Sequence, residues 1–146
     1  MDMGLTLKSF LVIFVMTSIS KVTMGFHFSG KTTIIIKNSF HSNAKSLYIH
    51  CRSKDDDIGE HWLAVGQTMA WSFRENAFST TLFHCYAQWG NKIKRFNAYE
   101  YKGTTKSCCP DQGKVTWFLE ENGLRAVQTD PKKNSQDKEL TKLNWD

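Results

Sequence analysis

Apolar and polar residues alternate along most of this chain, in short runs that end at turn residues. In Ser46–Arg52, for example, Leu47, Ile49 and Cys51 fall on one face. A period of two is typical of β-strands that bury one face. Seven or eight strands at this close spacing predict an all-β fold, a small antiparallel β-sandwich. The expected strands are Thr32–Asn38, Ser46–Arg52, His61–Val65, Thr68–Phe73, Thr80–Trp89, Ile93–Tyr101, Lys114–Glu120 and Leu124–Gln128.

Two local signals refine this prediction. The three consecutive isoleucines Ile34–Ile36 indicate a strand that is covered on both faces. The dipeptide Asn122–Gly123 indicates a tight hairpin, because both residue types readily take positive φ.

The first 25 residues have the layout of a secretory signal peptide. An apolar core runs from Ser9 to Ile19, and the small residues Thr23 and Gly25 precede a plausible cleavage site before Phe26. The core is shorter than the ~18–20 residues that span a bilayer. We therefore expect residues 1–25 to be cleaved and the product to be secreted and extracellular, without stable membrane insertion. A membrane anchor is the alternative.

The four cysteines, Cys51, Cys85, Cys108 and Cys109, all follow this leader. An even number of cysteines in an oxidising compartment predicts two disulfides. A bond between the neighbours Cys108 and Cys109 would strain the peptide between them. We therefore expect Cys51 to pair with one of them and Cys85 with the other. A zinc site is the alternative, although the sequence has no CxxC pair.

The remaining chain divides into a β-sandwich domain over residues 26–128 and a polar C-terminal tail over 129–146. In this tail, only Leu140, Leu143 and Trp145 could pack against the domain. Residues 1–25 contain two of the 19 basic and one of the 14 acidic side chains, so their removal leaves a net charge of +4. This basic excess is modest, and we expect a monomer that does not bind nucleic acid.

Several motifs, in this order, resemble the plant self-incompatibility protein family, which contains the stigmatic S-proteins and the S-protein homologues. The resemblance extends from about Ile34 to Gly123. The matching pieces are His50–Gly59 (HCRSKDDDIG), Trp71–Asn76 (WSFREN), Thr80–Cys85 (TTLFHC) with Trp89, Phe96 with Tyr99, and Trp117–Gly123 (WFLEENG).

This resemblance implies a small secreted β-sandwich with intramolecular disulfides and no catalytic activity, and some members act as pistil ligands that pollen reads. One position departs from the family. The family usually has a cysteine two residues before the late tryptophan, where this chain has Val115, and the extra cysteine lies instead in the Cys108–Cys109 pair.

Three consecutive carboxylates, Asp55–Asp57, lie between Lys54 and Glu60. The simplest interpretation is a solvated turn between strands, because water screens the repulsion between like charges. A partner-binding loop is the sharper interpretation. A Ca²⁺ site is the third, but EF-hand loops place their ligands at alternate positions and this run does not.

Histidines that precede cysteines suggest a nuclease-like alternative. His50 and His84 would lie on the strand face opposite Cys51 and Cys85, and paired imidazoles can act as general acid and base. No nucleophile elbow or phosphate-binding glycine loop accompanies them. Two surface histidines on half-exposed strands are the simpler interpretation, so we expect no enzyme activity and no cofactor or metal.

Basic and aromatic residues between Lys92 and Lys102 could form a surface for a polyanion or a receptor, although ordinary solubilising charge is the simpler interpretation. The four tryptophans of the expected strand region suit packing positions. A carbohydrate-stacking platform would need several of them to be coplanar and exposed. They are Trp62, Trp71, Trp89 and Trp117.

Taken together, the sequence predicts a secreted ligand for a cell-surface receptor protein in cell–cell signalling, such as pollen–pistil recognition. The expected recognition loops are Ser53–Glu60 and Asn91–Arg95. Their predicted contact residues are Lys54, Asp55, Asp56, Asp57, Glu60, Asn91, Lys92, Lys94 and Arg95. The alternatives are a cationic defence protein that binds microbial surfaces or anionic wall polysaccharide, and a small hydrolase.

Overall fold

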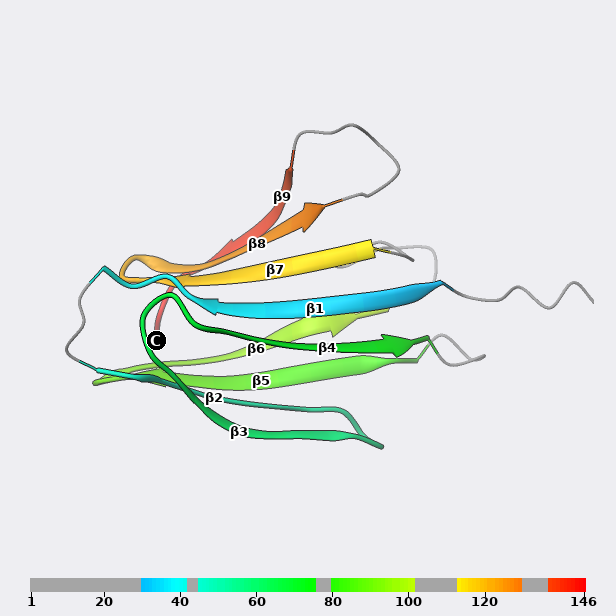
Figure 1. The fold of residues 1–146 in the computed structure, drawn as a ribbon, viewed down its shortest axis with the longest axis horizontal. Helices are drawn as coiled ribbons and strands as arrows, with labels where there is room; N and C mark the ends of the chain where they lie inside the picture. Colours follow the sequence, from blue (N-terminus) through cyan, green and yellow to red (C-terminus); the bar gives the residue numbers. More distant parts are fainter. Residues whose placement is uncertain (1–29, 42–44, 76–79, 102–112, 130–136) are drawn as a thin grey trace, which may run out of the picture.

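The structure, a computed structural model, describes residues 30–41, 45–75, 80–101, 113–129 and 137–146. Over these residues nine strands form a five-stranded sheet, β4-β1-β7-β8-β9, and a four-stranded sheet, β3-β2-β5-β6 (Figure 1). This confirms the predicted all-β sandwich. The strands are β1 (Lys31–Asn38), β2 (Leu47–Arg52), β3 (Asp57–Leu63), β4 (Thr68–Arg74), β5 (Leu82–Trp89), β6 (Lys92–Glu100), β7 (Gly113–Glu120), β8 (Gly123–Thr129) and β9 (Lys138–Leu143).

The core lies between the two sheets and is built by the alternation seen in the sequence. In β1, Ile34 and Ile36 are fully buried. Ile35, on the other face, is only half-buried, so the expected burial on both faces is wrong for this strand. Trp117 of β7 links the sheets, because its indole Nε1 donates a hydrogen bond of 3.1 Å to the carbonyl of Ala98 in β6.

The strands pair antiparallel as expected, with one difference. β1 and β7 run parallel, with Ile34 opposite Val115 and Ile36 opposite Trp117. Parallel neighbours need a long crossover, and here the whole four-stranded sheet lies in the chain between them. β1 is therefore an inner strand of the sandwich, flanked by β4 and β7.

The disulfide pairing differs from the expectation. Cys51 of β2 and Cys85 of β5 are bonded to each other, so neither of them is available to Cys108 or Cys109. The strand register places the two residues directly opposite, and both side chains point into the core. Cys108 and Cys109 lie outside the described residues, as does the expected leader.

The expected polar tail carries the ninth strand. β9 pairs antiparallel with β8, and Trp145 beyond it donates its Nε1 hydrogen to the carbonyl of Glu120 at 2.8 Å. The indole of Trp145 also lies 5.9 Å, between ring centroids, from Phe40, which itself stacks on Trp89 at 4.0 Å. The C-terminal segment is thus part of the sandwich. Its alternation is hard to see in the sequence, because β9 is an edge strand with charged residues on its open face.

The turn between β7 and β8 lies at the predicted hairpin, and Gly123 is required there for space. Its φ is +139°, and an added Cβ would lie 2.2 Å from the carbonyl oxygen of Leu143. A backbone atom cannot move aside cheaply, so any other residue at this position would push β9 away from β8.

A carboxylate in the same turn fixes the segment after β1. Glu121 accepts a hydrogen bond of 2.6 Å from the backbone N–H of His41 and lies 3.1 Å from the His41 ring Nδ1. These two contacts lower the pKa of the Glu121 carboxyl from its usual 4.5 to about 2. The ionised form is therefore the one that the fold stabilises.

Substitution of Glu121 by Gln should change how stability depends on acid. Since the folded pKa is depressed, the contribution of this carboxylate is present above pH 4.5 and is lost as pH falls toward 2. Urea unfolding across this range should show a wild-type advantage that shrinks and disappears near pH 2. Glu139→Gln, which removes an exposed carboxylate on β9, is the control. A gap that did not depend on pH would contradict the assignment.

No helix in the described ranges is both long and apolar enough to cross a membrane.

Candidate functional site

The predicted acidic run forms a compact turn between β2 and β3. We call residues Ser53–Asp57 the acidic turn. The backbone N–H of Ser53 donates to the carbonyl of Asp56 at 2.7 Å, and the Ser53 hydroxyl accepts from the N–H groups of Asp55 and Asp56 at 3.3 and 3.0 Å. A serine side chain that bonds the following backbone in this way favours a turn. The backbone that carries the carboxylates is therefore held by internal bonds.

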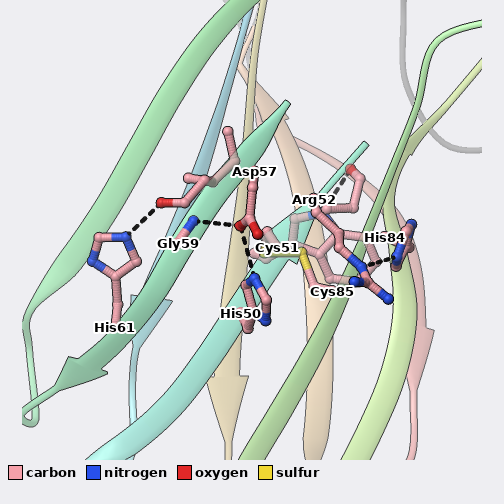
Figure 2. The surroundings of a disulfide bond; sticks show 11 residues. His50, Cys51, Arg52, Asp57, Gly59, His61, His84 and Cys85 are labelled. Atoms are coloured by element: carbon pink, nitrogen blue, oxygen red, sulfur yellow. Dashed lines mark hydrogen bonds and ion pairs between the residues drawn. A yellow bond between two sulfur atoms is a disulfide. The ribbon is translucent and has the colours of Figure 1, made fainter. Parts of the chain in front are cut away.

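The three carboxylates of this turn have different surroundings. Asp57 accepts from the N–H of Gly59 at 2.8 Å and lies 2.7 Å from His50 Nε2, and these bonds lower the pKa of its carboxyl (Figure 2). Asp55 and Asp56 are exposed, and their carboxylates make no ion pair within the described part of the chain. Asp57 therefore anchors the turn, while Asp55 and Asp56 present negative charge to solvent.

A hollow of about 470 Å³, which we call the end groove, lies beside the acidic turn. It contains apolar surface from Phe73 of β4 and from Leu82 at the start of β5, whose side chain is 38% exposed. The groove thus combines carboxylates at its rim with apolar contact area. Its lining comprises Ser53, Lys54, Asp55, Asp56, Phe73, Arg74, Thr80, Thr81, Leu82, Phe83 and His84.

The second predicted loop, Asn91–Arg95, starts at the opposite end of β5 from the acidic turn, but it is not a loop: the turn there is short, and Lys92–Arg95 are the first residues of β6, paired with β5 (Figure 1). Two of its cations are bound within the protein. Lys92 donates from Nζ to the carbonyl of Glu121, and Lys94 forms an ion pair with Asp146. Lys92 thus connects β6 to the turn between β7 and β8, and Lys94 connects β6 to the last residue, Asp146. Arg95 lies on the outer face of the four-stranded sheet, opposite Tyr86.

The two histidines of the hydrolase alternative lie close on adjacent strands but have separate partners. In the β2–β5 register, Tyr86 is opposite His50 and His84 is opposite Arg52. His50 bonds Asp57, and Arg52 donates from Nε to His84 Nε2 at 3.0 Å (Figure 2). The imidazoles are therefore oriented by different neighbours.

The environment of the tryptophans agrees with packing roles for three of them. Trp117 is buried, and Trp71 and Trp89 are half-buried against other aromatic rings. Trp62 of β3 is 68% exposed.

Sequence reasoning missed Arg52, Tyr86 and Leu82 as surface features. Their alternation in β2 and β5 indicated that they point outward, but not which neighbours share that face.

No group of three or more His, Cys, Asp or Glu side chains in the described residues is arranged to hold a metal ion.

Comparisons with known proteins agree with this architecture. The family model for plant self-incompatibility protein S1 matches residues 33–145. S-protein homolog 29 of Arabidopsis thaliana is 45% identical over 75 residues, which cover 51% of this chain and 55% of that protein. Self-incompatibility protein S1 of Papaver rhoeas is 39% identical over 83 residues, 56% of this chain and 58% of that protein. The chain therefore spans little more than half the length of these relatives.

A solved structure shows the same fold. It represents the self-incompatibility protein homologues, described as a widespread family of small, highly stable, secreted proteins from plants. The TM-score is 0.53 at 17% sequence identity, and the match covers 77% of this chain and 97% of that one. Because the family model matches nearly all of the sandwich, this chain belongs to the plant self-incompatibility protein S1 family.

Proposed function

We propose that this secreted protein is a ligand that a cell-surface receptor protein recognises at the acidic turn and the end groove. The observation that carries the proposal is the pair of exposed carboxylates, Asp55 and Asp56, on a backbone held by internal hydrogen bonds. The Papaver rhoeas relative is named for self-incompatibility, which is a recognition process between cells.

The rigidity of the acidic turn favours binding. A loop that is already ordered loses little conformational freedom when a partner docks, and this loss is a major cost of association. Ser53 holds the turn from one side, and the Asp57 contacts with Gly59 and His50 hold it from the other. Asp55 and Asp56 are therefore presented in a fixed place before the partner arrives.

The end groove supplies apolar contact area, which the charged residues of the acidic turn do not provide. Charged groups at a rim mainly set specificity and association rate, whereas affinity comes from desolvated apolar contacts. Leu82 and Phe73 provide such contacts next to Asp55 and Asp56. A receptor segment with a basic patch beside an apolar side chain would match this arrangement.

The double variant Asp55→Asn with Asp56→Asn tests this function. Labelled mature protein should bind plant cells that carry the receptor in a saturable manner. Unlabelled wild type should displace it, and the double variant should need at least ~10-fold more protein to do so, since two rim charges are removed. Binding should weaken with added salt, because the charges are exposed.

A matched control removes two carboxylates elsewhere. Asp137→Asn with Glu139→Gln makes the same charge change near β9, where both side chains are exposed. It should compete like the wild type. Equal competition by both double variants would show that the acidic turn is not the recognition site. Loss of secretion or folding only in the Asp55/Asp56 variant would show instead that the turn is structural.

A further inference from the structure

The outer face of the four-stranded sheet carries a row of ring-bearing and guanidinium side chains that crosses all four strands. Trp62 of β3 lies opposite Tyr48 of β2, and Tyr86 of β5 lies opposite Arg95 of β6. The ring centroids of Trp62 and Tyr48 are 4.8 Å apart, those of Tyr48 and Tyr86 are 6.0 Å apart, and the Arg95 guanidinium lies 5.1 Å from the Tyr86 centroid. We call these four residues the outer row.

A hollow of about 370 Å³ lies at the β5–β6 end of this row, above the Cys51–Cys85 bond. Two guanidinium groups, from Arg52 and Arg95, contribute to it, and no carboxylate lines it. We call it the cationic hollow. It is lined by His50, Arg52, His84, Cys85, Tyr86, Arg95, Phe96 and Asn97.

Neighbouring contacts hold the two guanidinium groups in place. Arg52 donates from Nε to His84, which leaves its terminal NH₂ groups for another acceptor, and Arg95 lies over the ring of Tyr86. The carboxylates that contact the lining residues are each hydrogen-bonded. Asp57, which also interacts electrostatically with Arg52, bonds Gly59 and His50, and Glu100 accepts from Asn97 Nδ2 at 3.0 Å. Burial, together with the neighbouring Glu60 carboxylate, raises the pKa of the Tyr48 phenol.

The composition of this face indicates the chemistry of a ligand. A planar guanidinium matches a carboxylate through two parallel hydrogen bonds. Trp62, which is 68% exposed, offers an apolar ring face on which a sugar can stack. The half-buried rings of Tyr48 and Tyr86 continue the row from it, with successive ring planes inclined by 58° and 65°. We propose that the outer face of the four-stranded sheet binds an acidic oligosaccharide of uronate units, with a carboxylate in the cationic hollow and sugar rings along the outer row.

Two other kinds of anionic partner fit less well. An extended acidic peptide would bind along an unpaired strand edge, whereas Arg52, His84 and Tyr86 of the hollow lie on β2 and β5, which are paired on both sides. An anionic membrane would favour several exposed apolar side chains, and the large exposed ones in the described residues are only Trp62 and Leu82. The cationic hollow and the end groove share His84, but Arg95 and Trp62 do not line the end groove and Asp55 and Asp56 do not line the hollow. Variants at these four residues therefore test the two proposals independently.

Calorimetric titration of the mature protein with de-esterified oligogalacturonate tests the proposal. Saturable binding that weakens with salt is expected, together with a change in tryptophan fluorescence. Fully methyl-esterified oligogalacturonate, which keeps the rings but lacks the charge, should bind at least ~10-fold more weakly. No saturable binding, or equal binding of polyglutamate or of phosphatidylserine vesicles, would overturn the assignment.

Variants separate the two parts of the site. Arg52→Gln with Arg95→Gln should lower affinity for the de-esterified oligomer by at least ~10-fold, since two charge-assisted contacts are lost. Trp62→Ala should weaken binding several-fold. Arg95→Lys should bind more tightly than the double Gln variant but less tightly than the wild type. Lys142→Gln, an exposed charge on β9 of the other sheet, is the matched control and should bind normally. Unchanged affinity in the first two variants would exclude this face as the site.

Discussion

Replacing both Cys51 and Cys85 with alanine is expected to lower the free energy of unfolding by about 3–4 kcal/mol. The bond closes a loop with a sequence separation of 34 residues, and in the chain-entropy model a loop of this size contributes about that much. The midpoint of thermal unfolding should fall by roughly 10–20 °C. Denaturant unfolding followed by tryptophan fluorescence measures the difference.

The double variant is preferable to either single one, because a lone thiol could exchange with Cys108 or Cys109. Alanine avoids a new buried hydroxyl in the core, where both cysteines lie. Peptide mapping of the wild type without reduction should recover Cys51 linked to Cys85. A bond from Cys51 to Cys108 or Cys109, or a double variant within about 0.5 kcal/mol of the wild type, would contradict this pairing.

The outcome for the cysteines shows what local pattern can and cannot predict. The alternation around Cys51 and Cys85 placed both side chains on the apolar face of their strands, and both are buried. Which strands become neighbours is a matter of topology, and no local pattern carries it. The strain of a Cys108–Cys109 bond therefore does not decide the partner of Cys51, because the strand register places Cys51 opposite Cys85.

Non-local contacts explain the other differences in the fold. Ile35 has the same side chain as Ile34 and Ile36, but it faces away from the second sheet and keeps some exposure. The strand β9 is polar because only one of its edges and one face are covered, so its composition resembles that of a tail. Its position depends on Gly123 and Trp145, whose contacts join residues far apart in the sequence.

The candidate site was predictable to a similar degree. The acidic run indicated an exposed turn, because water screens the repulsion between adjacent carboxylates, and Asp55 and Asp56 are exposed. The adjoining end groove could not be predicted from the sequence, because its lining residues come from β4, β5 and the acidic turn, which are separate in the chain. Likewise, the basic residues Lys92 and Lys94 suggested a binding loop, but the fold brings Glu121 and Asp146 to them.

Substitution of Trp117 by alanine is the second change with a large expected effect, a loss of about 3–5 kcal/mol in the free energy of unfolding. The side chain is 1% exposed and packs against Phe96, with 4.7 Å between the ring centroids. Its indole also donates the hydrogen bond to Ala98 that joins β7 to β6 across the core. Alanine would therefore leave a cavity at the place where the two sheets are connected.

A graded series distinguishes packing from the hydrogen bond. Trp117→Phe keeps most of the apolar ring and loses the donor, so its cost should fall between those of wild type and alanine. Trp62→Ala is the matched control, because the same substitution at a 68% exposed position should change stability by no more than about 0.5 kcal/mol. If the two alanine variants were equally stable in denaturant, Trp117 would not be the residue that joins the sheets. A stable Trp62→Ala protein would also establish that any loss of oligosaccharide binding in that variant comes from the surface itself.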